Sequence, residues 1–439
     1  MKRVLLLAST TSYRLDDFAA AARRLGVEAV IGIDRCHQLA EIWDREKFGG
    51  SLPVELRESA RAAQQIVAEA RVHPFDALIA TDDPTAEIAA LAARELGLPG
   101  NAPEAARTAR NKRLMRDALF AARVPSPRHQ VFPLDAPPDA PRFPCVLKPL
   151  LCSASRGVMR ADDPAGFRAA WQRLVALLET PALRAVEDPD GHQILVEDFV
   201  PGAEVAVEGV LTSGRLRVLA IFDKPDPLDG PFFEETLYIT PSRHSETEQA
   251  RIAEVTAAAA RAIGLVEGPI HAELRLSPSG LDIGEASGAS RGASEEAVPT
   301  RMPVLIEIAA RSIGGLCART LRFGLGEASL EEIVLRHALG DELGAADVLA
   351  RSGAAGVMMI PIPKGGVFHQ ALGVEAAREV PLIEDVVISA QAGQVLVPLP
   401  EGHAYLGFLF ARGEAPEAVE AALREAHRRL AFRIAPTLT

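Results

Sequence analysis

Two acidic side chains, Glu273 and Glu307, lie within apolar runs of the sequence and are the first candidates for chemistry. The runs cover residues 271–276 and 303–310, and their branched aliphatic residues are typical of strands. Because side chains alternate along a strand, each run projects its glutamate toward one face. Two strands that each present a carboxylate supply hard oxygen ligands and leave positions open for phosphate oxygens. The pattern therefore predicts a magnesium–phosphate site; the alternative is two ordinary strands whose outer faces carry charge.

A guanidinium and bare backbone follow the second run. The alternation predicts that Glu307, Ala309 and Arg311 share one face, and Gly314-Gly315 come directly after them. Glycine backbone has no side chain, which lets a ligand approach closely. The opposite face of this run is predicted to fill a core with Ile306, Ile308 and Ala310.

The first run also carries a histidine. His271, Glu273 and Arg275 are predicted to share one face of their strand. A histidine here could act on a reacting group, or it could be a structural histidine that is hydrogen-bonded at a strand end. Both readings stay open from the residues alone.

The composition narrows the class of protein. At 439 residues the chain is too long for one typical core, so about two to four lobes are expected. With 48% hydrophobic residues it is globular over most of its length. The formal net charge of −12 argues against a general nucleic-acid binder and against binding to an anionic membrane.

The cysteines and the N-terminal residues indicate the compartment. The cysteines form no CxxC pair, so neither a zinc site nor a disulfide framework is expected. We instead expect four reduced thiols in a cytoplasmic protein: Cys36, Cys145, Cys152 and Cys317. The apolar stretch 4–8 is too short for a signal peptide and is better explained as a buried first strand. No stretch of the sequence approaches the length of a membrane span.

Strands and helices alternate over residues 1–104, which predicts a doubly wound parallel sheet as the N-terminal domain. Ligands of such sheets bind at the carboxyl ends of the strands, where residues 9–13, Asp82 and Asp83 fall. The two aspartates could either cap the following helix or bind a ligand. The predicted elements are strands 4–8, 28–33 and 75–80 and helices 15–25, 57–71 and 85–96.

A lysine and a hydroxyl-rich loop come next. Lys148 ends a short apolar strand over residues 143–149, and the loop 152–158 reads Cys-Ser-Ala-Ser-Arg-Gly-Val. A lysine beside exposed backbone amides is a workable phosphate cradle, although an ordinary hairpin would have the same sequence. Before it, a helix is expected to carry Asn111-Lys112.

The rest of the chain is predicted to form two further lobes. Residues 105–345 would be the second domain, with a small lid lobe at about 122–196 and a larger lobe at 197–345. Residues 346–439 would be a separate C-terminal α+β lobe. Within the second domain we expect strands 193–200, 205–211, 216–222 and 232–240, a functional Pro/Asp/Gly-rich loop 223–231, and a mobile surface insertion 284–301.

Taken together, these stretches resemble the ATP-grasp superfamily and, within it, the L-amino acid ligases that form dipeptides. The resemblance rests on their order: Asn-Lys, Val-Leu-Lys-Pro, a Ser/Gly loop, Val-Glu-Asp-Phe-Val-Pro-Gly-Ala-Glu, Asp-Lys-Pro, His-Ala-Glu and Glu-Ile-Ala-Ala-Arg-Ser-Ile-Gly-Gly. It covers nearly the whole chain and implies an α/β ATP-grasp fold.

The resemblance also implies roles for residues. Lys112 and Lys148 resemble the lysines that contact ATP phosphates, under a loop that includes Ser153, Ser155 and Gly157. Glu197 with the backbone of Phe199 and Val200 resembles the adenine-binding hinge, and Glu204 the carboxylate for the ribose hydroxyls. Glu273 and Glu307 resemble the magnesium ligands, Arg311 the cation beside an acyl phosphate, and His271 a group near the reacting carboxylate.

The sequence departs from the superfamily at Ala309, where many members have a metal-binding asparagine. Water, substrate or a bidentate Glu307 could supply the missing oxygen, and the resemblance to dipeptide ligases marks this as a subgroup feature.

The implied function is an ATP-dependent carboxylate–amine ligase that works through an acyl phosphate, with Mg²⁺ or, in its place, Mn²⁺. Its partners would be a small carboxylate and a small amine, with L-amino acids favoured, and no nucleic acid or membrane. The alternatives are an ATP-grasp enzyme with bicarbonate, a purine precursor or a D-amino acid as acceptor, and a non-catalytic ATP-binding protein. A homodimer is the common expectation for a large soluble enzyme.

Overall fold

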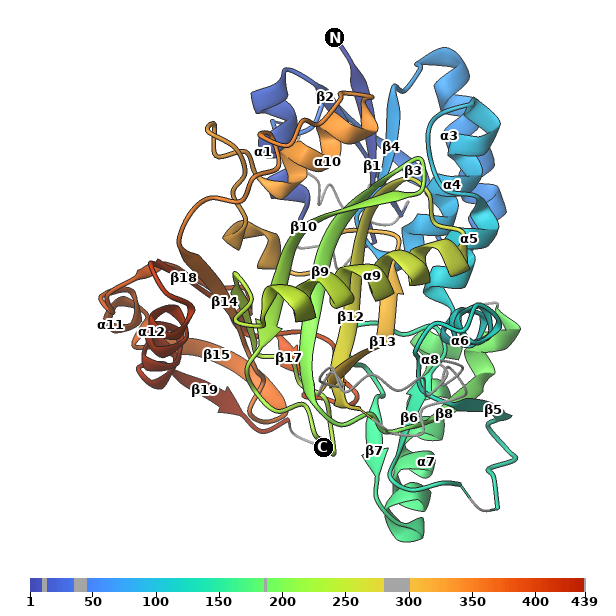
Figure 1. Cartoon of the computed structure of the whole chain (residues 1–439), viewed down its shortest axis with the longest axis vertical. Coiled ribbons are helices and arrows are strands. Elements are labelled where there is room, and N and C mark those ends of the chain that lie inside the picture. Colours follow the sequence, from blue (N-terminus) through green and yellow to red (C-terminus); the bar gives the residue numbers. More distant parts are fainter. Residues whose placement is uncertain (10–13, 35–45, 140, 185–187, 280–300, 438–439) are drawn as a thin grey trace, which may run out of the picture.

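The N-terminal part of the computed structural model is a parallel sheet in the order β3-β2-β1-β4 (Figure 1). Both faces of β1 are covered: Leu5 and Leu7 pack with α3 and α4, whereas Val4 and Leu6 pack with α1. This two-sided burial explains the continuous apolar run of the first strand. The elements are β1 Arg3–Leu7, α1 Leu15–Leu25, β2 Glu28–Asp34, β3 Gly50–Val54, α3 Ser59–Val72, β4 Ala77–Ala80 and α4 Asp83–Leu96.

The structure describes residues 1–9, 14–34, 46–139, 141–184, 188–279 and 301–437. The predicted insertion 284–301 lies outside the described residues except for Arg301, which begins a strand. None of the described helices combines the length and the apolar character that crossing a membrane requires.

A small antiparallel sheet, β5-β8-β6-β7, lies at the lower right of Figure 1 and takes in most of the segment predicted as a lid, so we call it the lid sheet. Helix α7 packs on it through Phe167, Trp171 and Leu174. The elements in and before the lid are α5 Pro103–Arg110, α6 Lys112–Ala121, β5 His129–Pro133, β6 Cys145–Pro149, β7 Met159–Ala161, α7 Pro164–Leu178, α8 Pro181–Arg184, the 3-10 turn Pro189–His192 and β8 Gln193–Asp198.

The largest sheet has eight strands in the order β13-β12-β9-β10-β11-β14-β18-β16. Helix α9 covers one face of it, and a capping box between Ser245 and Glu248 starts that helix (Figure 1). The elements before residue 345 are β9 Ala203–Thr212, β10 Arg215–Lys224, β11 Leu237–Thr240, α9 Glu246–Ile263, β12 Gly268–Pro278, β13 Arg301–Ala309, the 3-10 turn Cys317–Thr320 and α10 Leu330–Ala338.

The C-terminal segment adds three strands to the same sheet, because β14 pairs with both β11 and β18. It also forms a separate small sheet, β17-β15-β19. The central sheet therefore crosses residue 345, and the division into lobes 1–104, 105–345 and 346–439 is kept as a proposal. The elements are β14 Ala354–Ile360, β15 Gly366–Leu372, α11 Val374–Arg378, β16 Ile383–Ile388, β17 Val395–Leu396, β18 Gly407–Gly413, α12 Pro416–Arg428 and β19 Ala431–Ala435.

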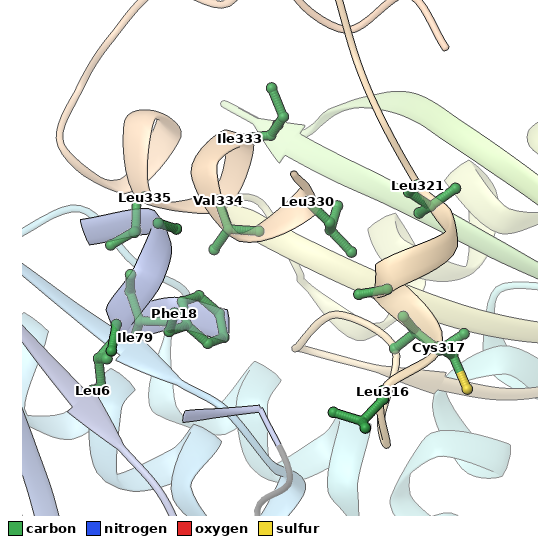
Figure 2. Packing of buried hydrophobic residues seen from close by; sticks show 14 of the residues in the cluster. Leu6, Phe18, Ile79, Leu316, Cys317, Leu321, Leu330, Ile333, Val334 and Leu335 are labelled. Atoms are coloured by element: carbon green, nitrogen blue, oxygen red, sulfur yellow. The ribbon is translucent and has the colours of Figure 1, made fainter. Parts of the chain in front are cut away.

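A shared hydrophobic cluster joins the N-terminal sheet to the central sheet. Figure 2 shows Leu6 and Ile79 of the first sheet and Phe18 of α1 beside Val334 and Leu335 of α10. The same cluster continues through the segment that contains Leu316, Cys317 and Leu321. This packing holds the ends of the N-terminal strands beside the turn that follows β13. The prediction of a mixed α/β architecture with an N-terminal parallel sheet is confirmed.

Two local predictions were wrong. The helix expected to carry Asn111-Lys112 is two helices, because the Asn111 side chain accepts the backbone N–H groups of Arg113 and Leu114 and starts α6. The strand expected over residues 232–240 begins only at Leu237. The preceding residues form only an isolated bridge between Phe232 and Met159, and Glu235 accepts a hydrogen bond from Lys224.

Candidate active site

One cavity of about 710 Å³ is lined by residues of the N-terminal, lid, central and C-terminal parts of the chain. Gly157 is the one predicted site residue, among those that the structure describes, that lies outside its wall. The other predicted residues line it: Lys112, Lys148, Ser153, Ser155, Glu197, Phe199, Val200, Glu204, His271, Glu273, Glu307 and Arg311.

Glu273 and Glu307 lie directly opposite one another on the antiparallel strands β12 and β13. Opposite residues on paired strands have Cβ atoms about 4.5–5.5 Å apart, so two carboxylates share one small region. Both side chains line the cavity, together with Ala309 and Arg311 from the same face of the second run.

A β-bulge follows this pair and corrects one expectation. Glu273 pairs with Glu307, but the next residue, Leu274, pairs with Leu305, which leaves Ile306 without a partner. Ile306 lines the cavity instead of filling the core, and Leu305 takes the core position. The extra residue lets Ile306 and Glu307, although adjacent in sequence, both line the cavity.

Lys224 lies among three carboxylates. Its Nζ donates to Glu204 at 2.8 Å, to Glu235 at 2.6 Å and to Glu273 at 3.0 Å. One oxygen from each carboxylate lies within 4.8 Å of the others. Burial would lower the pKa of Lys224, but the three carboxylates hold its pKa well above the ordinary value. Lys224 is therefore a permanent cation beside the glutamate pair.

The carboxylates in this cluster differ in charge state. Burial would raise the pKa of Glu273, but Lys224 and His271 hold it well below the ordinary value. Burial, with repulsion from Glu273, raises the pKa of Glu235 to about 7. Glu273 is therefore ionised and is the stronger candidate for a metal ligand. Ionised carboxylate oxygens are the donors that Mg²⁺ prefers, so the residues present fit that ion.

Glu204 is held by two cations. Its second oxygen accepts from Arg275 Nε at 2.9 Å, and Arg275 also donates to the carbonyl oxygen of Val200 at 2.9 Å. The predicted ribose carboxylate is thus fixed against the end of the predicted adenine hinge. The Arg275 guanidinium also lies 5.2 Å from the centroid of the Phe199 ring.

His271 is held by a buried carboxylate on the neighbouring strand. Its Nδ1 lies 2.5 Å from Glu208 Oε1, and its Nε2 lies 3.5 Å from Glu273 Oε1. Burial would lower the pKa of His271, but Glu208 and Glu273 raise it to about 9. The ring is therefore a cation at neutral pH, held between two acids.

Arg311 pairs across the boundary between the N-terminal and central sheets. Its Nη2 donates to Asp83 Oδ2 at 2.8 Å, at the start of α4. Burial would raise the pKa of Asp83, but Arg311 holds it below the ordinary value. Asp82 instead accepts the backbone N–H of Ser9 and the hydroxyl of Thr85. Asp82 is thus the N-cap residue of α4 but makes no side-chain capping hydrogen bond, Asp83 pairs with Arg311, and both line the cavity.

The two predicted phosphate-binding lysines each have oxygen neighbours in the cavity. Lys148 Nζ lies 2.5 Å from Glu197 Oε1, and the same carboxylate accepts from Arg116 Nε at 3.0 Å. Burial would raise the pKa of Glu197, but Arg116 and Lys148 hold it below the ordinary value. Lys112 Nζ donates to the Cys152 carbonyl oxygen at 2.7 Å and lies 3.4 Å from Glu307.

The hydroxyl-rich loop is attached to the C-terminal part of the chain. The backbone N–H of Gly157 donates to the Pro400 carbonyl oxygen at 2.7 Å, and Arg156 Nε donates to the Glu401 carbonyl oxygen at 2.9 Å. Arg173 of α7 also donates to the Glu401 carboxylate, with Nη2 lying 2.8 Å from Oε2. A turn near residue 400 thus holds both the loop and the lid helix.

Removing the Arg173–Glu401 contact tests this attachment. We expect Arg173→Ala to raise KM for ATP up to about fivefold and to leave kcat nearly unchanged, because an exposed ion pair contributes about 0.2–1 kcal/mol. The measurement is steady-state kinetics at low and at high salt, since salt screens such pairs. Arg428→Ala, which removes an exposed pair with Glu425 on α12, is the matched control. An equal effect in both variants would contradict a role for the contact.

Several cavity-side residues escaped the sequence analysis: Asp83 as the Arg311 partner, Glu208, Glu235, Arg116, and Lys224 as an individual residue. Lys224 had a usable signal, because it belongs to the Asp-Lys-Pro motif. Glu208 had a weaker one, since it is a single acid within the aliphatic strand β9. Asp83 and Arg116 acquire their partners, Arg311 and Glu197, through contacts between residues far apart in the sequence.

Three protein-family models match the chain. They are an ATP-grasp N-terminal domain over residues 18–100, an ATP-grasp domain over 141–293, and the L-amino acid ligase C-terminal domain 2 over 358–435. The chain therefore contains regions that match ATP-grasp domain models, and it is similar to proteins of the ATP-grasp superfamily. Within that superfamily it resembles the L-amino acid ligases.

Similar proteins and structures agree with this. Alanine–anticapsin ligase of Bacillus subtilis strain 168 is 28% identical over 288 residues, which is 61% of this chain and 55% of that protein. Human carnosine synthase 1 is 28% identical over 240 residues, 51% of this chain and 28% of that protein. The match to the first thus covers about half the length of that relative. The crystal structure of an L-amino acid ligase from Bacillus licheniformis has the same fold, with a TM-score of 0.77, 23% identity and 99% coverage of both chains.

Proposed function

We propose that the chain is an ATP-dependent ligase that joins a carboxylate to an amine through an acyl phosphate. The observation that carries this proposal is the directly opposed pair Glu273 and Glu307, in one cavity with Lys112, Lys148 and Arg311. Phosphoryl transfer needs charge stabilisation on the moving phosphoryl group more than it needs covalent chemistry. Carboxylates that hold a divalent cation, together with fixed cations around them, supply that stabilisation.

In this proposal ATP lies along the cavity from the lid to the glutamate pair. Lys148 and Lys112 would contact its phosphates beneath Ser153 and Ser155. Neither lysine has to lose a proton to do so, and each is kept in place by an anionic or carbonyl oxygen nearby. Glu197, with the backbone of Phe199 and Val200, would form the adenine end, and Glu204 would accept the ribose hydroxyls.

Glu273 and Glu307 would hold Mg²⁺ or Mn²⁺. The chemistry that such an ion would supply is neutralisation of the phosphate charge during transfer. Ala309 brings no oxygen ligand, so in this proposal Glu307, water or substrate completes the coordination.

Arg311 and His271 would serve the acyl half of the reaction. The substrate carboxylate takes the γ-phosphoryl group, ADP leaves, and the amine then attacks the acyl carbon and expels phosphate. Arg311 has a fixed guanidinium that suits acyl-phosphate oxygens. His271, as a cation between Glu208 and Glu273, would orient the carboxylate or stabilise the tetrahedral intermediate.

The names of the similar proteins favour amino acids as substrates. They are an L-amino acid ligase, an alanine–anticapsin ligase and carnosine synthases. We therefore propose that both substrates are small and that L-amino acids are the first class to examine.

The test is phosphate release from ATP and Mg²⁺ across a matrix of L-amino acids, singly and in pairs, with mass spectrometry of the products. We expect release with particular pairs and a product of the condensed mass. Release with single acids alone would indicate acyl-phosphate formation with the wrong amine. No phosphate release with amino acids, together with release in the presence of bicarbonate or a purine precursor, would overturn the proposal that the substrates are amino acids. Tight ATP binding without release under any condition would overturn the enzymatic proposal.

A further inference from the structure

Burying the carboxylate of Glu208 at its position in the sheet costs free energy. It lies in β9, among Val205, Val207 and Val210, and its side chain is fully buried. An aliphatic residue would pack there without difficulty, whereas a buried carboxylate loses its hydration and must be compensated by hydrogen bonds or cations. The contacts that compensate Glu208 therefore indicate why a glutamate stands here.

Each oxygen of Glu208 holds a different part of the cavity wall. Strands β9 and β12 are antiparallel neighbours, and Glu208 stands directly opposite His271 in their register. Oε1 lies 2.5 Å from Nδ1 of that ring. Oε2 accepts the backbone N–H of Ile313 at 3.1 Å.

The two held parts, His271 and Ile313, both line the cavity. With Nδ1 taken by Glu208, the other ring nitrogen, Nε2, lies 3.5 Å from Glu273 Oε1. Ile313 belongs to the turn that begins at Arg311 and continues through Gly314, and all three residues line the cavity. One carboxylate thus sets both the ring orientation of His271 and the position of the backbone after Arg311.

We propose that Glu208 is a positioning residue, which fixes the His271 ring and the turn after Arg311 against a bound carboxylate substrate. The role of this residue rests on the proposed ligase function, because it acts through groups assigned to the acyl half of that reaction. It does not itself line the cavity.

Glu208→Gln is the first variant, because glutamine keeps the size of the side chain and removes its charge. We expect kcat to fall about 10- to 100-fold, as is typical when the hydrogen-bond partner behind a site residue is lost. KM for ATP should change less than kcat, because Glu208 has no contact with the residues assigned to the adenine and the ribose and reaches Glu273 only through His271. Glu267→Gln is the matched control. It alters another carboxylate–histidine pair, Glu267–His337, which lies 3.2 Å apart and outside this cavity. Equal rates in both variants would overturn the proposal.

A double-mutant cycle with His271→Asn separates positioning from a general structural role. If Glu208 acts largely through His271, its substitution in the His271→Asn protein should cost no more than about threefold, because coupled residues are not additive. The full loss in that background would overturn action through the ring. Glu208→Asp keeps the charge with a shorter reach, and partial recovery of kcat relative to Glu208→Gln is expected.

Nitrogen-15 NMR of histidine-labelled protein tests the contact without any activity. The imidazole signals of His271, assigned by their loss in His271→Asn, should shift in Glu208→Gln and stay unchanged in Glu267→Gln. Unshifted signals would overturn the contact. If wild-type protein releases no phosphate with any substrate, that result counts against the ligase proposal alone, and the NMR measurement decides the Glu208–His271 contact.

Discussion

Glu307→Gln should abolish most turnover while the protein stays folded. The substitution keeps the shape of the side chain but removes one carboxylate of the opposed pair, and we expect phosphate release to fall by at least about 10²–10³-fold, the usual cost of losing one transition-state contact. The Glu307 side chain is 27% exposed, and its cationic neighbour, Lys112 Nζ, is 3.4 Å away. Because the Glu307 side chain is partly exposed, loss of this ion pair should change the free energy of unfolding by about 1 kcal/mol or less.

The measurement is phosphate release at increasing Mg²⁺, with thermal unfolding as the check on folding. A right-shifted Mg²⁺ dependence is expected if the residue binds the ion. Glu254→Gln, on the exposed surface of α9, is the matched control and should behave as wild type. Full activity of Glu307→Gln at ordinary Mg²⁺ concentration would contradict the assignment of Glu307 as a metal ligand.

Arg311→Met should lower both turnover and stability, for two separable reasons. Turnover should fall about 10³-fold or more, because a guanidinium at a transferring phosphoryl group commonly contributes that much. Stability should fall by on the order of 3 kcal/mol, because Asp83, whose side chain is 14% exposed, would lose the cation that compensates its burial.

The double variant Asp83→Asn/Arg311→Met separates these effects. Removing both charges should return the melting temperature close to that of wild type, since no unpaired charge is left. Turnover should stay at the level of the single variant, because asparagine supplies no cation. Recovery of turnover together with stability would make Arg311 a structural residue and remove it from the proposed reaction.

The exact placement of the first helix illustrates what local patterns determine. Helix α1 was predicted over residues 15–25 and occupies Leu15–Leu25, ended by Gly26 in the left-handed conformation. The hydrophobic periodicity and the terminating glycine both lie within a dozen consecutive residues, so no contact with a distant residue is needed to predict the helix. The strands around Glu273 and Glu307 were found in the same way, from alternation and branched residues.

The bulge at Ile306 illustrates where local patterns stop. Strict alternation assigns Ile306 to the core, but one extra residue in β13 relative to β12 moves it to the cavity. A bulge is a property of the pairing between two strands, and neither strand encodes the choice by itself.

Residue types, the order of motifs and the face on which most site residues lie were readable from the sequence, because they follow from short-range periodicity and from a family resemblance. The partners of those residues were not. Glu208 is 63 positions from His271, and Asp83 is 228 positions from Arg311. Such pairs depend on strand register and on the packing of one sheet against another. Register and packing are determined only when the whole chain folds and buries its apolar faces. The sequence by itself therefore determined which groups could do the chemistry, and only the tertiary structure decided which charges hold them in place.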